Sequence, residues 1–196
     1  VKACFVVENV AGLNLNARVM IVQMKGATIN ITNTSAFGDI TAMNEAGNYE
    51  IGTICNIKND SVFLFHIPLN NYTPSTGKVQ LVQFAEYLSA NVVDTVKAMP
   101  WDSATGMGGV IAIYANNSIT LNAPIYADSS GYSGGIFLNH SGACNLFTPA
   151  GTGFAYDASA AGAQNGAYKG EGVSDVPATL DGAKGAPANG GGGGNN

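Results

Sequence analysis

Few side chains in this sequence have the type and spacing that chemistry requires. The 13 acidic residues include no Asp-x-Asp and no pair on one strand face, whereas glycoside hydrolysis needs two carboxylates at one bond. The only arginine, Arg18, lies beside an apolar run, where a charge at a strand edge serves solubility more simply than lyase chemistry. Trp101 could stack on a sugar ring, but capping of a core is the simpler interpretation.

The histidines and cysteines form no metal or nucleophile pattern. His66 and His140 have no His or Cys at metal-ligand spacing, so we expect a structural role for both. Cys4, Cys55 and Cys144 are an odd number, so at most one pair can form a disulfide, and the sequence does not say which. Three buried thiols are the alternative.

Two further patterns suggest chemistry only superficially. The sequence GYSGG at residues 131–135 fits G-x-S-x-G, but a nucleophile elbow needs a helix after the serine, and IFLN favours a strand. Loops at residues 39–45 and 128–131 are candidates for calcium, although their spacing matches no EF-hand. We therefore expect no enzymatic activity, no catalytic residue and no cofactor, with calcium the one metal left open.

Composition limits the class of protein. Charged residues make up only 11% of the 196 residues, against about 25% in ordinary soluble domains, and apolar residues make up 46%. The net charge is -5 without any basic cluster, which argues against a nucleic-acid partner. No apolar run approaches the roughly 20 residues of a membrane-spanning helix. Low charge with much Gly, Asn, Ser and Thr is typical of an exported surface protein, and the start at Val1 suggests a segment of something larger.

Two regions differ in composition. Residues 1–130 hold nine of the 26 glycines and most of the Val, Ile and Leu, so they can form a β-rich domain with a core. Residues 131–196 are rich in Gly, Ala and Asn and have one aromatic residue after Asp157, which predicts an irregular segment.

The first region predicts short strands throughout. They are rich in β-branched and aromatic residues and are expected at residues 18–24, 27–32, 49–57, 61–67, 79–84, 109–115 and 118–127. Turn dipeptides separate several of them, at residues 25–26, 59–60, 76–77 and 116–117. The one helical candidate, residues 84–98, lacks a cap and contains NVVDTV, so we expect a strand or loop there.

A repeated sequence pattern of short strand, polar corner and short strand predicts an all-β fold. We expect a short-stranded β-solenoid, similar to a parallel β-helix, in which each coil stacks its apolar face on the next. A β-sandwich is the alternative, because strands spaced by 8–12 residues fit it equally well.

Six stretches, in this order, resemble the N-terminal region of very large surface proteins of Bacteroidota. They are residues 17–29, 37–54, 70–84, 108–135, 166–173 and 185–196. Proteins of this family are exported by the type IX secretion system and are known as gliding-motility or adhesin proteins. The resemblance covers nearly the whole chain and carries no catalytic residue with it.

The resemblance implies a secreted protein at the cell surface that serves attachment or gliding motility. It implies the outer-membrane type IX secretion machinery as a partner, with surface polysaccharide or other adhesin segments as further candidates. Two other functions stay open: a carbohydrate-binding or β-helix carbohydrate-active module, and a filament subunit that assembles through open strand edges.

The resemblance also bears on the last residues and on modification. It implies that the final glycine run begins a longer glycine-rich stretch, so that the chain ends inside it; residues 185–196 then form either a packed bundle of glycine helices or a flexible linker. Ser61, Thr95 and Ser103 follow aspartate and precede an apolar residue, the pattern associated with O-glycosylation in this bacterial group. Chance in a chain rich in Ser and Thr is the alternative.

Overall fold

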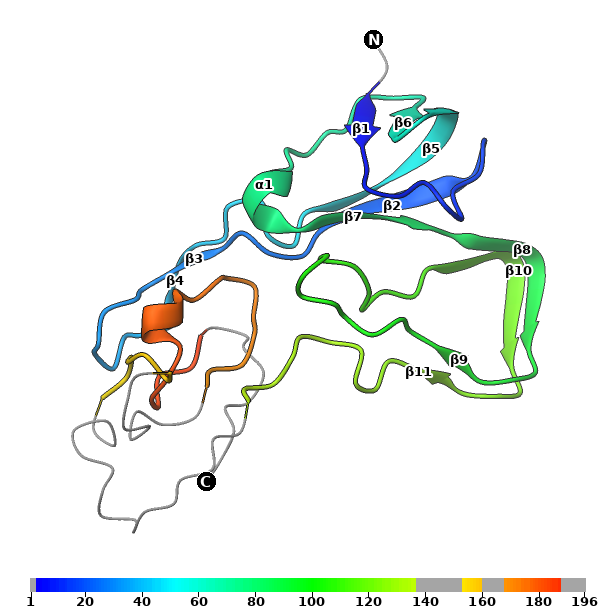
Figure 1. The fold of residues 1–196 in the computed structure, drawn as a ribbon. Coiled ribbons are helices and arrows are strands. Elements are labelled where there is room, and N and C mark those ends of the chain that lie inside the picture. Colours follow the sequence, from blue (N-terminus) through cyan, green and yellow to red (C-terminus); the bar gives the residue numbers. More distant parts are fainter. Residues whose placement is uncertain (1–2, 137–152, 160–167, 188–196) are drawn as a thin grey trace. The chain divides into compact units, whose positions relative to one another are not determined.

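The protein is mostly β-structure with almost no helix (Figure 1). The computed structural model describes residues 3–136, 153–159 and 168–187. The chain forms two compact units: the first comprises Val1–Met24 and Gly47–Gly131, and the second comprises Lys25–Ala46 and Tyr132–Asn196. Residues 25–46 therefore belong with the glycine-rich part of the chain, a grouping that composition did not indicate. No helix in the described ranges is both long enough and apolar enough to span a bilayer.

The first unit contains a five-stranded antiparallel sheet in the order β1-β6-β5-β2-β7. Its strands are β1 (Cys4–Val6), β2 (Arg18–Gln23), β5 (Tyr49–Lys58), β6 (Ser61–Leu64) and β7 (Val79–Gln83). Strand β2 lies between β5 and β7, and its residues alternate between buried and half-buried. This alternation follows from the strand period of two, which sends Val19 and Ile21 to one face.

One face of this sheet carries the core of the first unit. Val19, Ile21, Ile54, Val62 and Leu64 are fully buried and form one cluster. Half-buried residues from the N-terminal segment and from β7 pack against the cluster: Ala3, Phe5, Val7, Val10, Leu13, Val79 and Leu81. The N-terminal residues therefore close the core over the sheet, which fixes their position beside β7.

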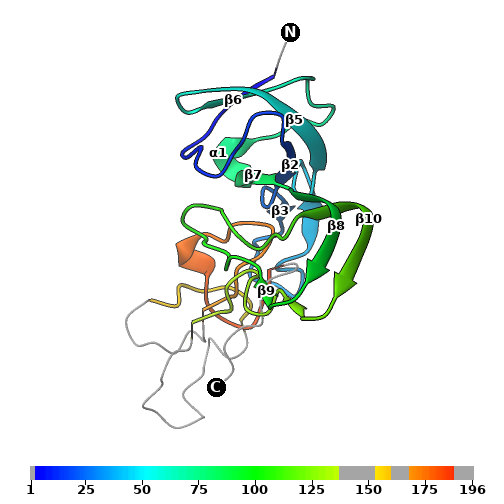
Figure 2. The ribbon, with the colours of Figure 1, turned by 90° about the vertical axis from the view of Figure 1, so that its right-hand side faces the viewer.

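Two parallel pairs continue the first unit. Strand β8 (Ala85–Val92) pairs with β10 (Ile113–Leu121), and β9 (Val96–Lys97) pairs with β11 (Ile125–Tyr126). Figure 2 shows β8 and β10 side by side. Two successive passes of the chain thus stack in parallel, and β8 and β9 confirm the expectation of strand rather than helix over residues 84–98.

The parallel pair contains a bulge where the sequence predicted a turn. Ala115 is opposite Tyr87 and Ser118 is opposite Ser89, so β10 has one residue more than β8 between these points. That extra residue falls at Asn116 and Asn117, which lie inside β10 instead of at a corner.

The predicted β-solenoid is absent from the described part of the chain, and no sheet there is closed. Residues 49–64, whose pattern of strand, turn and strand suggested coils of a solenoid, form an antiparallel hairpin, β5-β6. Asn59 in its turn has a φ of 52°, the left-handed conformation that tight hairpins favour. The antiparallel pairing is what the sandwich alternative requires, but the other described strands form only two-stranded pairs.

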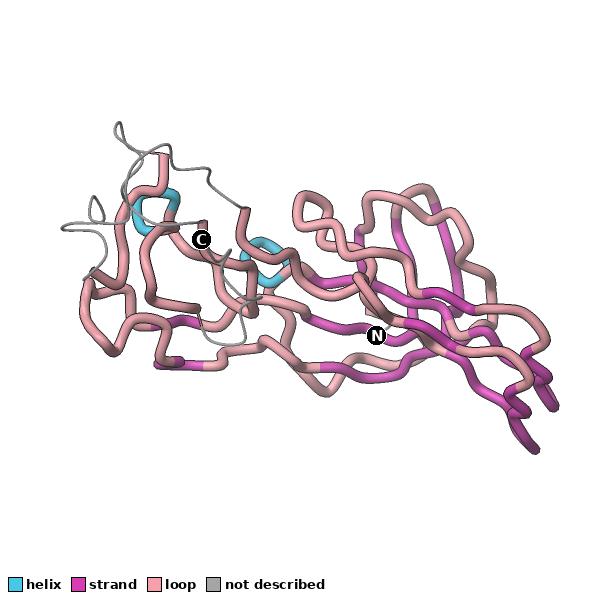
Figure 3. The backbone as a smooth tube through the Cα atoms, turned by 90° about the horizontal axis from the view of Figure 1, so that it is seen from below, coloured by secondary structure: helices cyan, strands magenta, loops and turns pink. Residues whose placement is uncertain are grey.

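The described residues of the second unit contain little regular structure. They form the antiparallel pair β3 (Thr28–Ile29) and β4 (Ile40–Ala42) and the 3-10 turn η3 (Ala178–Leu180). Figure 3 shows η3 and the short helix α1 (Pro74–Gly77) of the first unit as the helical turns among strands and loops. The buried apolar residues of the second unit are mostly small: Ala27, Ile29, Phe37, Ala46, Ala155 and Ala158.

We expect Leu64→Ala to lower the free energy of unfolding of the first unit by about 2–5 kcal/mol, because it leaves a cavity in the core. Leu69→Ala is the matched control, since Leu69 is 95% exposed, and we expect a change within about 0.5 kcal/mol. Urea unfolding followed by tyrosine and tryptophan fluorescence measures both values. Equal losses for the two variants would contradict the assignment of the core to this face.

Candidate functional site

Arg18, at the start of β2, is held by neighbours on two other strands. Its Nε donates a hydrogen bond to Glu86 Oε1 of β8, and its guanidinium lies 3.9 Å from the ring centre of Tyr114 on β10. The hydrogen bond to Glu86 raises the pKa of Arg18 above its ordinary value. The arginine therefore links the five-stranded sheet to the pair β8-β10, and its charge is matched by a carboxylate.

Lys25 forms an enclosed ion pair with Glu171 and a second pair with the exposed Asp175. Its side chain is only 6% exposed, and its Nζ lies 2.6 Å from Glu171 Oε1 and 3.0 Å from Asp175 Oδ1. The ammonium also lies 5.8 Å from the ring centre of Tyr132. Burial, and then the charges of Glu171 and Asp175, raise the pKa of Tyr132 to about 12. This cluster joins three separate stretches of the second unit.

Lys169 lies among main-chain carbonyls of the second unit. Its Nζ donates to the carbonyls of Phe154 (2.6 Å), Ala183 (3.2 Å) and Gly185, and it lies 4.4 Å from the ring centre of Phe37. Loss of water on burial lowers the pKa of Lys169 to about 8. We call this arrangement the Lys169 site. Its hydrogen bonds connect the segments around residues 154, 169 and 185, which have few apolar side chains of their own.

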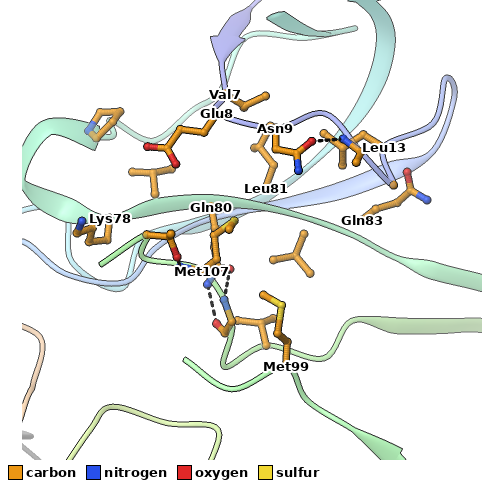
Figure 4. A pocket seen from close by; sticks show the side chains of 18 of the residues that line it. Val7, Glu8, Asn9, Leu13, Lys78, Gln80, Leu81, Gln83, Met99 and Met107 are labelled. Carbon is orange, nitrogen blue, oxygen red and sulfur yellow. Dashed lines mark hydrogen bonds between the residues drawn. The ribbon is translucent and has the colours of Figure 1, made fainter. Parts of the chain in front are cut away.

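A groove runs along β7 in the first unit, with a volume of about 480 Å³ (Figure 4). Residues 79–83 of β7 form its floor, residues 6–13 form one wall, and residues 99–110 supply the other. We call it the β7 groove. Its ionisable residues are Glu8 and Lys78, and Lys78 Nζ donates to the carbonyl of Ala104 at 2.8 Å.

Gln80 fixes the second wall of the β7 groove. Its side chain, 8% exposed, donates to the carbonyl of Gly108 at 3.0 Å and accepts from the Gly108 N–H at 3.2 Å. Gly108 has a φ of 100°, and a Cβ there would collide with the carbonyl of Pro100. Glycine is therefore required for this close approach. Asp102 orders the same wall by accepting from Ala104 N–H and the Thr105 hydroxyl, which hold its pKa below the ordinary value.

A second cavity of about 650 Å³ lies beside β8 and β9. Small and apolar residues such as Ala85, Ala90 and Val92 dominate its lining, and its ionisable residues are Tyr87, Asp94 and Lys97. Neither cavity brings two carboxylates together. Within the ranges described, no group of three His, Cys, Asp or Glu residues could hold a metal ion, and this includes the loops at residues 39–45 and 128–131.

The structure places the remaining sequence-predicted residues apart from the two cavities or in structural positions. His66 is exposed. Trp101 is 7% exposed, and its main-chain N–H donates to the carbonyl of Ser130 at 3.2 Å. Trp101 is thus part of the interior and offers no platform for a sugar. Ser133 of the G-x-S-x-G match is exposed, and its N–H donates to Glu171 Oε2 at 3.3 Å. His140 lies outside the described residues.

The two described cysteines lie too far apart for a disulfide, and the candidate glycosylation sites differ in exposure. Cys4 and Cys55 are free thiols on β1 and β5, which both pair with β6 and so stand on either side of it. Two strand spacings amount to about 10 Å, more than a disulfide spans. Cys144 lies outside the described residues. Thr95 and Ser103 are exposed in loops, whereas Ser61 is half-buried at the start of β6; the structure does not test their modification.

The sequence analysis did not single out Lys25 and gave Lys169 no role. Both lie next to glycine in stretches without a recognisable motif, and their partners are distant in the chain: Asp175 for Lys25, and Phe154 and Gly185 for Lys169. The only local sign of a role for either lysine was its positive charge in a segment with very few charged residues.

The Lys169 site predicts a pH dependence. The pKa of Lys169 is about 8 in the folded protein, against its ordinary value of 10.5, so the unfolded chain binds more protons between these values. Below pH 8 both states are charged and the cost of burying the ammonium is present in full; above 10.5 both are neutral and the cost is gone. The contribution of Lys169 to the free energy of unfolding therefore rises as the pH rises through this window.

Urea unfolding of the wild type and of Lys169→Met from pH 7.5 to 11 checks this expectation. We expect the wild type to gain stability relative to the variant as the pH rises. A wild type that loses stability relative to the variant over the same range would show that the three carbonyls favour the ammonium more than burial penalises it.

Comparison with known proteins adds no family to these observations. The chain matches no protein-family model, no curated protein and no solved structure. The bound charged side chains, the Lys169 site and the β7 groove are therefore the observations on which a function can rest.

Proposed function

We propose that this chain is a structural and adhesive segment of a large secreted surface protein that serves attachment or gliding motility. In this proposal the chain is not an enzyme, and the type IX secretion machinery exports the protein that contains it. The resemblance of its sequence to surface proteins of Bacteroidota suggested this role. The structural observation that supports it is that the charged side chains bind other groups of the same chain.

The charged side chains of the described residues are largely bound within the scaffold. Arg18 pairs with Glu86, Lys25 pairs with Glu171 and Asp175, and Lys169 binds main-chain carbonyls. An active site instead gathers ionisable groups with perturbed pKa values around a cleft. Here the perturbed groups support the fold, which favours a structural role over a catalytic one.

Exposed apolar side chains on the parallel pairs favour a role in surface contact. Tyr87 and Leu88 of β8 are 52% and 69% exposed, and Leu121 of β10 and Tyr126 of β11 are 59% and 43% exposed. Tyr87 and Leu88 are consecutive in one strand and point to opposite faces, so each face of the pair carries an exposed apolar group. This observation agrees with adhesion to a partner or a solid surface.

A filament subunit is the second candidate function. The pair β8-β10 is a two-stranded sheet, so each of its strands has an edge without a strand partner in the described structure. Such edges can take up a strand from another copy. A carbohydrate module receives less support, because Trp101 is buried and Arg18 is already paired.

Glycosylation would fit the proposed place at the cell surface. Thr95 and Ser103 are the better candidate acceptors, since both are exposed and lie in loops, while Ser61 is half-buried in a strand. The intact mass of the protein from its native host would show the added sugar.

The proposal predicts where the segment is found and what its removal does. On intact cells that make the full protein, antibodies against residues 1–131 should label the outside, and cells without the type IX translocon should lose this labelling. Removal of these residues from the full protein should lower attachment to a surface while the remainder is still displayed. Labelling that requires lysis of the cells, or unchanged attachment, would contradict the proposal.

A further inference from the structure

Strand β7 has one edge that no strand of the described residues covers. In its antiparallel pairing with β2, Phe84 N–H donates to the carbonyl of Arg18 and Met24 N–H donates to the carbonyl of Lys78. Because bonded residues alternate along an antiparallel ladder, the even-numbered residues from 78 to 84 direct their main-chain groups toward β2. Val79, Leu81 and Gln83 therefore direct theirs away from β2, where no described residue bonds to them.

The same edge already carries a strand farther along the chain. Ala85 continues the odd-numbered series after Gln83, and its N–H donates to the carbonyl of Ala112 at 2.9 Å. From there β10 pairs with β8 in parallel. Residues 108–112, which precede β10, turn away from the edge of β7 toward one wall of the β7 groove. The edge of β7 is therefore open to the groove.

The two walls can receive the side chains of an extended peptide. Even-numbered side chains of β7 face residues 99–110, as the bonds from Gln80 to Gly108 show, and Leu81 faces the N-terminal segment and the core. An added strand would alternate in the same way, with one set of side chains toward Met99 and Met107. These methionines are 57% and 41% exposed, and their flexible side chains suit a surface that adapts to its ligand.

The length and the charge of the groove restrict its occupant. The span from Val79 to Gln83 is about 13 Å at the rise of a strand, which suits four or five extended residues. Glu8 lines the groove near Lys78, is exposed and forms no ion pair with another described residue (Figure 4). Lys78 Nζ is already engaged by the carbonyl of Ala104. A basic side chain at this end would therefore find a carboxylate.

We propose that the β7 groove binds an extended segment of a partner polypeptide, which adds to β7 as a sixth strand of the sheet. The segment supplies main-chain N–H and C=O groups to Val79, Leu81 and Gln83, places small or medium apolar side chains against both walls, and carries a basic residue opposite Glu8. Strand addition of this kind takes its affinity from the main chain and its specificity from alternate side chains. It goes beyond the proposed adhesive role and does not depend on it.

The walls favour a single peptide strand over a second copy of this chain. The edge of β7 is bordered on one side by residues 6–13 and on the other by residues 99–110, so pairing of two β7 edges would bring both pairs of walls together. A slender peptide avoids this collision. A second copy is accordingly an outcome that the test must be able to detect.

The probe is the hexapeptide acetyl-Lys-Val-Thr-Val-Thr-Val-amide, with two versions that carry N-methyl groups on alternate residues. We expect the parent peptide to bind at or below about 1 mM and to slow hydrogen exchange at the amides of Val79, Leu81 and Gln83. One methylated version should lose binding, because its donors to β7 are blocked, and the other should keep it. Equal behaviour of the two versions, or no binding, would overturn the proposal.

Leu81→Pro and Leu81→Ala form the matched pair of variants. Both shorten the side chain, but only proline removes the N–H that points into the groove, and this N–H is not used by β2. We expect Leu81→Pro to bind the peptide about tenfold more weakly than Leu81→Ala, as for the loss of one hydrogen bond. Equal affinity of the two variants would overturn the proposal.

Two measurements on the unmodified protein keep the test valid if the proline variant does not fold. Exchange at the three amides with and without peptide needs no variant. Sedimentation at increasing protein concentration shows self-association, and slow exchange that grows with protein concentration in the absence of peptide would assign the edge to a second copy instead.

Discussion

The first unit depends on one change of hydrogen-bond partner within a single extended stretch, residues 79–92. Phe84 N–H donates to Arg18 in β2, and the next N–H, that of Ala85, donates to Ala112 before β10. Neighbouring residues of an extended chain direct their main-chain groups to opposite sides. The antiparallel sheet therefore lies on one side of this stretch and the parallel pair on the other. Arg18 supports the change of partner, because it reaches Glu86 on β8 and Tyr114 on β10 from the start of β2.

Most strands of the first unit could be predicted from sequence, although β1 was not expected and the run at residues 109–115 only overlaps β10. The way the strands pair could not be predicted. Alternation and β-branched content are local, so the runs at residues 18–24, 49–57 and 79–84 correspond closely to β2, β5 and β7. Pairing depends on which distant strand offers matching main-chain groups, and short strands of similar composition do not specify this. The solenoid was expected from the repeated pattern of strand, polar corner and strand. The described structure stacks passes of the chain in parallel only for β8-β9 on β10-β11.

The second unit shows how a chain poor in large apolar groups keeps an ordered path. Asn33 Oδ1 accepts hydrogen bonds from Phe154 N–H and Ala155 N–H at 2.6 and 3.0 Å, and the Lys169 ammonium binds three carbonyls. Single polar side chains thus satisfy main-chain groups that a regular sheet would otherwise pair. Sequence reasoning missed these positions because the neighbouring residues give no sign of their partners. The partners of Asn33 lie more than 100 residues away in the chain, and Lys169 binds main-chain carbonyls, which any residue carries.

Two free edges of the first unit, those of β10 and β7, are protected in different ways, and this difference bears on what each edge can bind. Proteins usually protect an edge with charges, proline or a bulge. Strand β10 has a bulge at Asn116 and Asn117, which makes its outer edge irregular. Strand β7, with the sequence VQLVQ, has no charge, proline or bulge, and its edge is protected only by the walls of residues 6–13 and 99–110. Walls of this kind exclude a whole sheet but leave a regular set of donors and acceptors accessible to one strand, which is the arrangement that a peptide-binding edge requires.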